Sequence, residues 1–342
     1  MSSRPLDYNF PELLLPAPIS GCFSHPDYFI WCGSAVRGED GLYHLFYSRW
    51  LRQYGFAAWV THSEIARATS PSAFGPYEHQ EVVLPARGAE FWDGLCTHNP
   101  TIQHFAGRYY LYYMGNTGDG VNLPGLNWTH RNNQRIGVAV ADRPEGPWRR
   151  FNEPLIAPTP GFPDALCMAN PSVTGRPEGG YLMVYKGVDN QRPLPFGGPV
   201  RHFVALADRP EGPFTKQPGA IFTANEVPFP AEDPFVWSES GKYFAIVKDM
   251  GGFFTGQGRS LALFESTDGL DWQLSAHALV STTEVLWEEG HRQKLHALER
   301  PQLLLEHGRP VALLCAASID IDAADSQTFN VQIPLRPRTA QE

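Results

Sequence analysis

Three carboxylates with the chemistry for acid and base catalysis stand at the starts of two apolar segments. Glu232 and Asp233 open the segment "AEDPFVW", and Glu299 opens "LERPQLLL". Glycosidic bonds are cleaved by a protonated carboxyl that donates to the leaving oxygen, together with an ionised carboxylate that attacks or activates water. We therefore expect Glu232, Asp233 and Glu299 to form a catalytic group, if the fold brings the two segment starts together.

These two segments belong to a unit that occurs five times in the chain. Each copy has a short polar motif, an apolar strand, a glycine-containing turn and a second aromatic-rich strand, and the copies begin "WCGSAVRG", "THNPTIQ", "MANPSVTG", "AEDPFVW" and "LERPQLLL". Aligning Ser34 with the four prolines of the other copies gives a period of about 66 residues. The five copies fill the chain.

The repeat predicts an all-β fold, a five-bladed β-propeller. Aromatic residues make up 13% of the 342 residues, with 32 glycines and 31 prolines, as many short strands and tight turns require. Such units bury their faces by stacking radially, which leaves a central channel with the active site at one end. We expect one domain over residues 1–342, with blades starting near residues 31, 98, 169, 232 and 299. Pairing of the N-terminal stretch with "TFNVQIPL" would close the ring.

One octapeptide is almost duplicated, as "ADRPEGPW" at 141–148 and "ADRPEGPF" at 207–214. Both copies follow strands with alternating apolar residues, which predicts half-buried strands. Asp, Pro and Gly in these strings favour a turn, and the final Trp148 or Phe214 would pack between blades.

Innermost strands face the channel, so other polar or aromatic residues near their starts are candidates for substrate binding. Trp31 offers a stacking face for a sugar ring. Asp27 and Asp93 precede blade starts on the loop side, where a base would stand. The full set of predicted substrate-binding residues is Trp31, Asp27, Asp93, His98, Asn99, Asn170, Lys186, His296 and Arg300.

The five-unit layout, the "AEDPF" and "LERPQL" strand starts and the hairpins of pattern D/E-G-x-Y-x-L-x-Y resemble the five-bladed propeller glycoside hydrolases of families 43, 32, 68 and 117. These are the arabinanase, invertase and levansucrase superfamily. The resemblance implies a glycosidase that removes a terminal sugar from an oligosaccharide. It also implies an aspartate base or nucleophile in the first blade, a helper aspartate in the third, and a glutamate general acid in the fourth.

The carry-over of these roles is incomplete. Glu232 takes the place of the general acid, and we expect burial and a neighbouring carboxylate to raise its pKa. The helper position holds Asn170, and the base position falls on Gly33, beside Cys32. Three alternatives stay open. Asp27, Asp93 or Glu299 could replace the base, with His98 or His296 as an acid like the histidine of family 117. Inorganic phosphate, held by Arg, Lys or His, could replace the carboxylate in a phosphorylase. The propeller could also bind carbohydrate without catalysis.

The charge and cysteine content restrict partners and compartment. The formal charge of −9 and the lack of clustered Lys and Arg argue against nucleic acid. No apolar stretch is long enough to span a membrane, and the N-terminal leucine run is too short for a signal peptide. Five cysteines without CxxC spacing predict buried thiols in a reducing compartment. We therefore expect a cytoplasmic protein with no cofactor and no metal in the site, while a structural divalent ion in the channel stays open.

Overall fold

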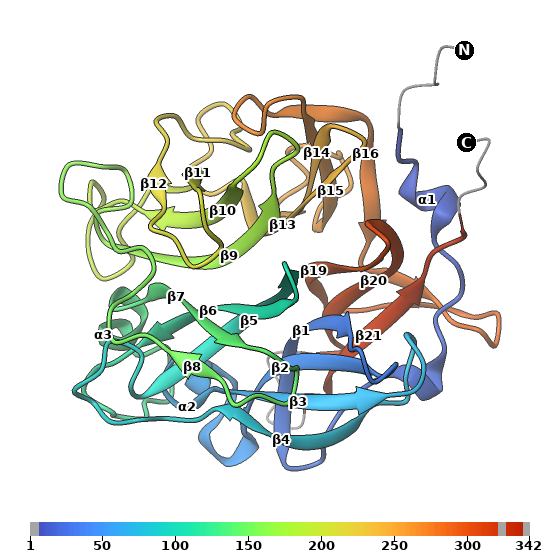
Figure 1. Ribbon diagram of the computed structural model, residues 1–342, viewed down its shortest axis with the longest axis horizontal. Helices are drawn as coiled ribbons and strands as arrows, with labels where there is room; N and C mark the ends of the chain where they lie inside the picture. Colours follow the sequence, from blue (N-terminus) through green and yellow to red (C-terminus); the bar gives the residue numbers. More distant parts are fainter. Residues whose placement is uncertain (1–6, 321–325, 338–342) are drawn as a thin grey trace.

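Five antiparallel sheets surround a central axis (Figure 1). The structure, a computed structural model, describes residues 7–320 and 326–337. Four sheets have four strands in sequence order, the fifth has three, and the first strand of each sheet is the innermost. This arrangement is a five-bladed β-propeller and confirms the predicted fold class. Residues 1–6, 321–325 and 338–342 of the expected domain lie outside the described residues.

The strands of each blade have the following bounds. The first blade contains β1 (Tyr28–Arg37), β2 (Tyr43–Leu51), β3 (Glu64–Ser70) and β4 (Glu78–Leu84). The second contains β5 (Cys96–Phe105), β6 (Arg108–Asn116), β7 (Arg135–Ala141) and β8 (Arg149–Arg150). The third contains β9 (Cys167–Gly175), β10 (Tyr181–Val188), β11 (Val200–Ala207) and β12 (Thr215–Lys216). The fourth contains β13 (Ala231–Glu239), β14 (Lys242–Asp249), β15 (Ser260–Ser266) and β16 (Gln273–Thr282), and the fifth contains β19 (Ala297–Glu306), β20 (Arg309–Ser318) and β21 (Thr328–Pro334).

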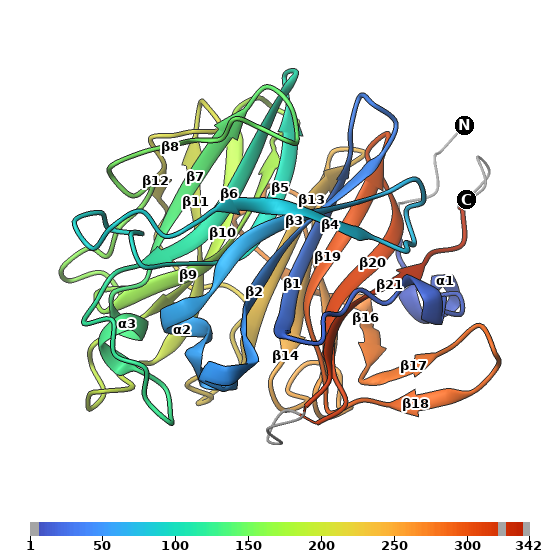
Figure 2. The ribbon, with the colours of Figure 1, turned by 90° about the horizontal axis from the view of Figure 1, so that it is seen from below.

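The remaining elements are short. A separate hairpin, β17 (Glu284–Leu286) and β18 (Arg292–Lys294), projects from the side of the propeller (Figure 2). The α-helices are α1 (Phe10–Leu13), α2 (Trp59–His62) and α3 (Trp128–Asn132), and the 3-10 helices are η1 (Ile19–Gly21), η2 (Arg52–Tyr54) and η3 (Phe56–Ala58). No helix among the described residues has the length and apolar character needed to cross a membrane.

The N-terminal segment lies against the outer edge of the fifth blade. Leu14 pairs with Leu335, directly after β21, and Phe23 pairs with Asn330 in β21, both in antiparallel fashion. The Phe23 and Asn330 backbones exchange two hydrogen bonds of 2.9 Å. Backbone segments from near both ends of the sequence therefore pair at the sheet of the fifth blade.

The core consists of clusters between neighbouring blades, because each sheet packs on both faces. In β6, Tyr112 packs with the third blade, whereas the next residue, Tyr113, packs with the first. Both side chains are fully buried. The prediction of half-buried strands is therefore wrong for β7, which is buried at six of its seven positions, since stacking covers both of its faces.

The duplicated octapeptide forms the turns from β7 to β8 and from β11 to β12, as predicted. Trp148 packs on Phe46 between the first two blades, and Phe214 joins the cluster between the second and third. The string therefore belongs to the frame. The loops with α2 and α3, which follow the second strands, lie together at one end of the propeller (Figure 2).

Candidate active site

Each innermost strand carries a β-bulge near its start, at the end of the propeller where α2 and α3 lie. The ladder register shifts there in all five blades. One residue of each bulge has a positive φ of 53–55°, and these residues are Cys32, Asn99, Asn170, Asp233 and Arg300. Neighbouring side chains of a regular strand point to opposite faces, but a bulge re-aims one of them. Glu232 and Asp233 therefore both line one pocket, as do Glu299 and Arg300.

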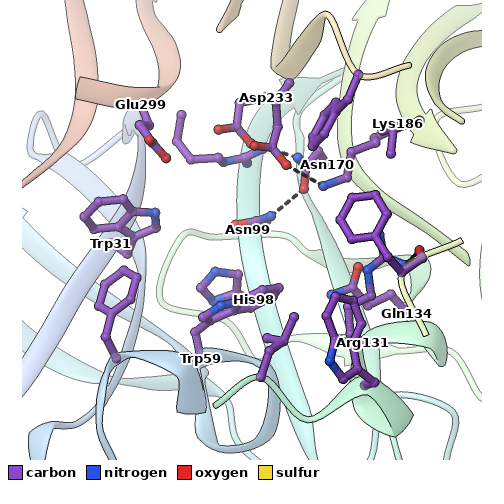
Figure 3. Close-up of a pocket in the computed structure, with 18 of the residues that line it drawn as sticks. Trp31, Trp59, His98, Asn99, Arg131, Gln134, Asn170, Lys186, Asp233 and Glu299 are labelled. Carbon is purple, nitrogen blue, oxygen red and sulfur yellow. Dashed lines mark hydrogen bonds and ion pairs between the residues drawn. The ribbon is translucent and has the colours of Figure 1, made fainter. Parts of the chain in front are cut away.

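The five bulge residues join in a row across the channel, and we call them the floor ring. Four of them, Asn99, Asn170, Asp233 and Arg300, line this pocket. The Cys32 thiol donates to Asn99 Oδ1 at 2.8 Å, and Asn99 Nδ2 donates to Asn170 Oδ1 at 2.5 Å. Asn170 Nδ2 donates to Asp233 Oδ1 at 2.7 Å, and Arg300 Nη1 lies 3.5 Å from the same oxygen. Figure 3 shows the amides of Asn99 and Asn170 and the Asp233 carboxylate in this line.

Alternating charges form one wall above the floor ring. Lys186 Nζ lies 2.7 Å from Glu232 Oε1, and Lys248 Nζ lies 3.6 Å from Glu232 Oε2 and 2.7 Å from Glu299 Oε1. One ammonium therefore lies between the two glutamates and holds both of their carboxylates at one side of the pocket. We call these four residues the charged wall.

The neighbouring carboxylates of the fourth blade differ in proton affinity. Burial alone would raise the pKa of Glu232, but Lys186 and Lys248 outweigh it and lower the pKa to about 2. Burial, and then the charge of Glu232, raise the pKa of Asp233 to about 6, against the opposing effect of Arg300. The expected rise in the pKa of Glu232 is therefore wrong, because two lysines rather than a carboxylate dominate its surroundings.

The opposite part of the pocket is aromatic. The His98 ring lies between Trp50 and Trp59, with centroid distances of 5.7 and 5.0 Å, and its Nδ1 is 2.7 Å from Ser63 Oγ. Burial, followed by the charges of Arg300 and Lys186, holds the pKa of His98 well below its usual value. His98 is thus a neutral ring in an aromatic wall, and Trp31 lines the pocket beside it (Figure 3).

In the first blade the floor position belongs to Cys32, one residue before the predicted Gly33. The Gly33 N–H donates to Asn330 Oδ1 at 3.0 Å, and a Cβ at Gly33 would lie 2.8 Å from that side chain. Gly33 therefore corresponds to the prolines of the other copies, and the alignment through Ser34 is wrong by one residue. Burial raises the pKa of the Cys32 thiol, which disfavours a thiolate nucleophile.

Three predicted substrate-binding residues lie away from the pocket. Asp93 is fully buried between blades, where Arg87, Arg150 and Tyr113 bind its carboxylate. Asp27 is exposed, and the pocket lining includes neither it nor His296. Their positions a few residues before blade starts place them in connecting segments rather than in the re-aimed bulges.

The pocket also contains residues that the sequence interpretation missed. The loops supply Trp59, Arg131 and Gln134 to its lining, and the second strand of the fourth blade supplies Lys248 behind it, paired with Glu299. Lys248 could have been found, because Lys186 and Lys248 end the similar strings "YLMVYK" and "YFAIVK". The loop residues have no such counterpart. Among the described residues, no group of three or more His, Cys, Asp or Glu side chains is placed to hold a metal ion.

No protein-family model and no curated protein matches the chain, but solved structures match along most of it. A family 117 glycoside hydrolase from Zobellia galactanivorans is 17% identical with a TM-score of 0.63, over 91% of this chain and 85% of that one. The Bacillus subtilis arabinanase is 14% identical with a TM-score of 0.57, over 92% and 96%. An exo-β-1,3-galactanase from Phanerochaete chrysosporium is 12% identical with a TM-score of 0.55, over 90% and 62%. The predicted resemblance is confirmed for the fold, which this chain shares with propeller glycoside hydrolases.

Proposed function

We propose that the protein is a glycosidase that removes a terminal sugar from an oligosaccharide by carboxylate catalysis. The observation that carries the proposal is the pair Glu232 and Asp233, two neighbouring carboxylates in one pocket with opposite pKa shifts. Such divergence allows one group to donate a proton while the other stays ionised. The hydrogen bonds of the floor ring across the channel favour exo action, because a saccharide that enters the pocket would meet them with one end.

In this proposal Asp233 is the proton donor, and the ionised Glu232 attacks the anomeric carbon or activates water. Lys248 is a positioning residue that fixes Glu232 and Glu299 by its two ion pairs. Lys186 holds the other oxygen of Glu232. This assignment moves the acid from Glu232, where the resemblance placed it, to the next residue.

Leaving-group dependence tests these roles. With a substrate found by screening glycosides, Asp233→Asn should lose about 10²–10⁴ in kcat/KM when the leaving group is a poor one. It should lose less than about tenfold on the matching dinitrophenyl glycoside, whose leaving group needs no protonation. Glu232→Gln should lose activity on both substrates. The opposite pattern would exchange the two roles, and unchanged activity in both variants would remove the pair from the mechanism.

The pH profile is an independent readout. Because the donor must be protonated, kcat/KM should fall above about pH 6, near the pKa of Asp233. The remaining activity of Asp233→Asn should lack this fall. An unchanged profile in the variant would exclude Asp233 as the donor.

A carbohydrate-binding propeller without catalysis is the second candidate. Cys32 and Asn170 favour it, because they occupy floor positions where the related hydrolases are expected to carry aspartates. Saccharide binding by calorimetry, with no product from the same ligands after long incubation in water or phosphate, would establish this second function.

A further inference from the structure

The pocket carries more positive charge than its carboxylates neutralise. Three cationic side chains line it, Arg131, Lys186 and Arg300, and Lys248 stands behind them. The carboxylates of the lining, over the described residues, are Glu232, Asp233 and Glu299. The four cations exceed the three carboxylates by one, although the whole chain has a formal charge of −9.

Arg131 is the cation without a carboxylate partner among the described residues. Its Nη1 donates to the Phe196 carbonyl at 2.7 Å and to Asn132 Oδ1 at 3.0 Å. Its guanidinium carbon lies 5.0 Å from the Phe196 ring centroid and 5.6 Å from that of Trp128. Arg131 is only 9% exposed, so these contacts hold a nearly buried charge in a fixed orientation.

The Nε and Nη2 atoms of Arg131 have no hydrogen-bond partner in the described part of the chain. These two atoms form the edge of a guanidinium that binds a carboxylate through two parallel hydrogen bonds. Arg300, 2% exposed in the floor, likewise has unpartnered Nε and Nη2 atoms. Burying the donor edge of a guanidinium without acceptors is costly, so an anion bound in the pocket would offset that cost.

The position of Arg131 in the pocket indicates which part of a bound substrate it would contact. Figure 3 shows Arg131 and Gln134 across the pocket from Trp31 and Glu299. We propose that the substrate is an acidic saccharide whose carboxylate binds Arg131, while the sugar ring lies between this residue and Trp31. This inference rests on the proposed glycosidase function and names its substrate class.

Calorimetry on the purified protein tests the proposal without turnover. The probes are two matched pairs, glucuronate with glucose and galacturonate with galactose, at constant ionic strength. In at least one pair the uronate should bind at least about tenfold more tightly. Arg131→Gln should remove that difference, and Arg131→Lys should keep part of it. Arg143→Gln, which removes an exposed arginine with a side-chain exposure of 71%, should change neither affinity.

Equal affinities within both pairs, or no binding of either uronate, would overturn the proposal, provided that the melting temperature shows Arg131→Gln to be folded. Inorganic phosphate tests whether the cationic side chains bind a phosphate ion instead of a sugar carboxylate. If phosphate displaces the bound sugar acid or is required for turnover, the cationic surplus serves a phosphate co-substrate and the acidic-saccharide proposal fails. Uronate binding that depends on Arg131, with no cleavage of any glycoside, would refute the glycosidase proposal and leave only the recognition of a carboxylate by Arg131. Cleavage of neutral glycosides alone, with no preference for uronates, would support the glycosidase proposal and refute the acidic-saccharide proposal.

Discussion

Two buried aspartates of the second and fourth blades illustrate two different uses of a carboxylate. Asp93 receives Arg87 at 2.5 Å, Tyr113 at 2.6 Å and Arg150 at 3.1 Å. Asp233 receives Asn170 at 2.7 Å and one guanidinium nitrogen at 3.5 Å. Asp93 is therefore saturated with donors and charge, whereas Asp233 is left short of both.

The fully compensated aspartate, Asp93, also has an equivalent in another blade. Asp164 of the third blade is fully buried, binds Tyr185 and Lys216, and lies against Gly187 just as Asp93 lies against Gly115. In both blades a Cβ on that glycine would lie 2.4–2.6 Å from the aspartate Cβ. A repeated carboxylate with full compensation indicates a structural role, while an unrepeated and poorly compensated one indicates chemistry.

The largest effect should come from removing the saturated carboxylate. Asp93→Asn leaves Arg87 and Arg150 buried without their anion, so the free energy of unfolding should fall by about 3–5 kcal/mol. Urea unfolding measures this loss. The variant protein that remains folded should keep near wild-type activity, because Asp93 does not line the pocket. A stable Asp93→Asn variant that has lost activity would show that Asp93 serves the active site and not the frame.

A smaller loss is expected when the ammonium shared by Glu232 and Glu299 is removed. Lys248→Met leaves two half-buried carboxylates facing each other, which should cost about 2 kcal/mol at pH 7. The lowered pKa of Glu232 stabilises the wild type above the unfolded value of about 4.5, and this contribution is lost as the pH falls towards 2. The deficit of the variant should therefore shrink in acid.

The matched control for this variant is Lys242→Met. Lys242 pairs with Glu265 at 3.3 Å in a more exposed position, so its loss should cost less than about 1 kcal/mol. A deficit of Lys248→Met that stays constant with pH would show that the lysine acts by packing alone.

Asp233→Asn should change stability by less than about 1 kcal/mol at pH 7, because an amide escapes the burial cost of the charge. Since the folded pKa of Asp233 is raised, wild-type stability falls as the pH rises from about 4 to about 6, and the variant lacks this fall. Thermal melts at several pH values measure it. A large destabilisation at every pH would place Asp233 with Asp93 in the frame.

The sequence predicts the blades and their turns well, because the repeated copies share the residues that form them. The period, the strand starts and the octapeptide turns all follow from repeated apolar and turn residues. The same logic would have excluded Asp93, since "FWDGLC" before β5 has the counterpart "FPDALC" before β9. A carboxylate present in two copies belongs to what the copies have in common.

The site is only partly predictable, because its chemistry depends on contacts between copies. Glu232 has a sequence neighbour, Asp233, that suggests a raised pKa, but Lys186 and Lys248 come from two other strands and reverse the shift. Arg131 lies in helix α3, which no repeated string of the sequence marks. The one-residue error at Gly33 has a similar cause, because only the observed bulge shows which residue of blade one replaces the proline motif.

The smallest effect is expected for Cys32→Ser in the floor ring, and Cys32→Ala is its comparison variant. Cys32→Ser keeps a donor to Asn99 Oδ1 and should alter the free energy of unfolding by less than about 0.5 kcal/mol. Cys32→Ala removes that donor and should cost about 1–2 kcal/mol, since the buried amide oxygen loses its partner. Chemical denaturation of both variants isolates the hydrogen bond from the change in volume. Equal losses in the two variants would mean that packing, and not the hydrogen bond, holds the Cys32 side chain. The floor ring would then belong to the structural frame, as Asp93 does, and would not be a set of hydrogen-bond donors beneath the substrate.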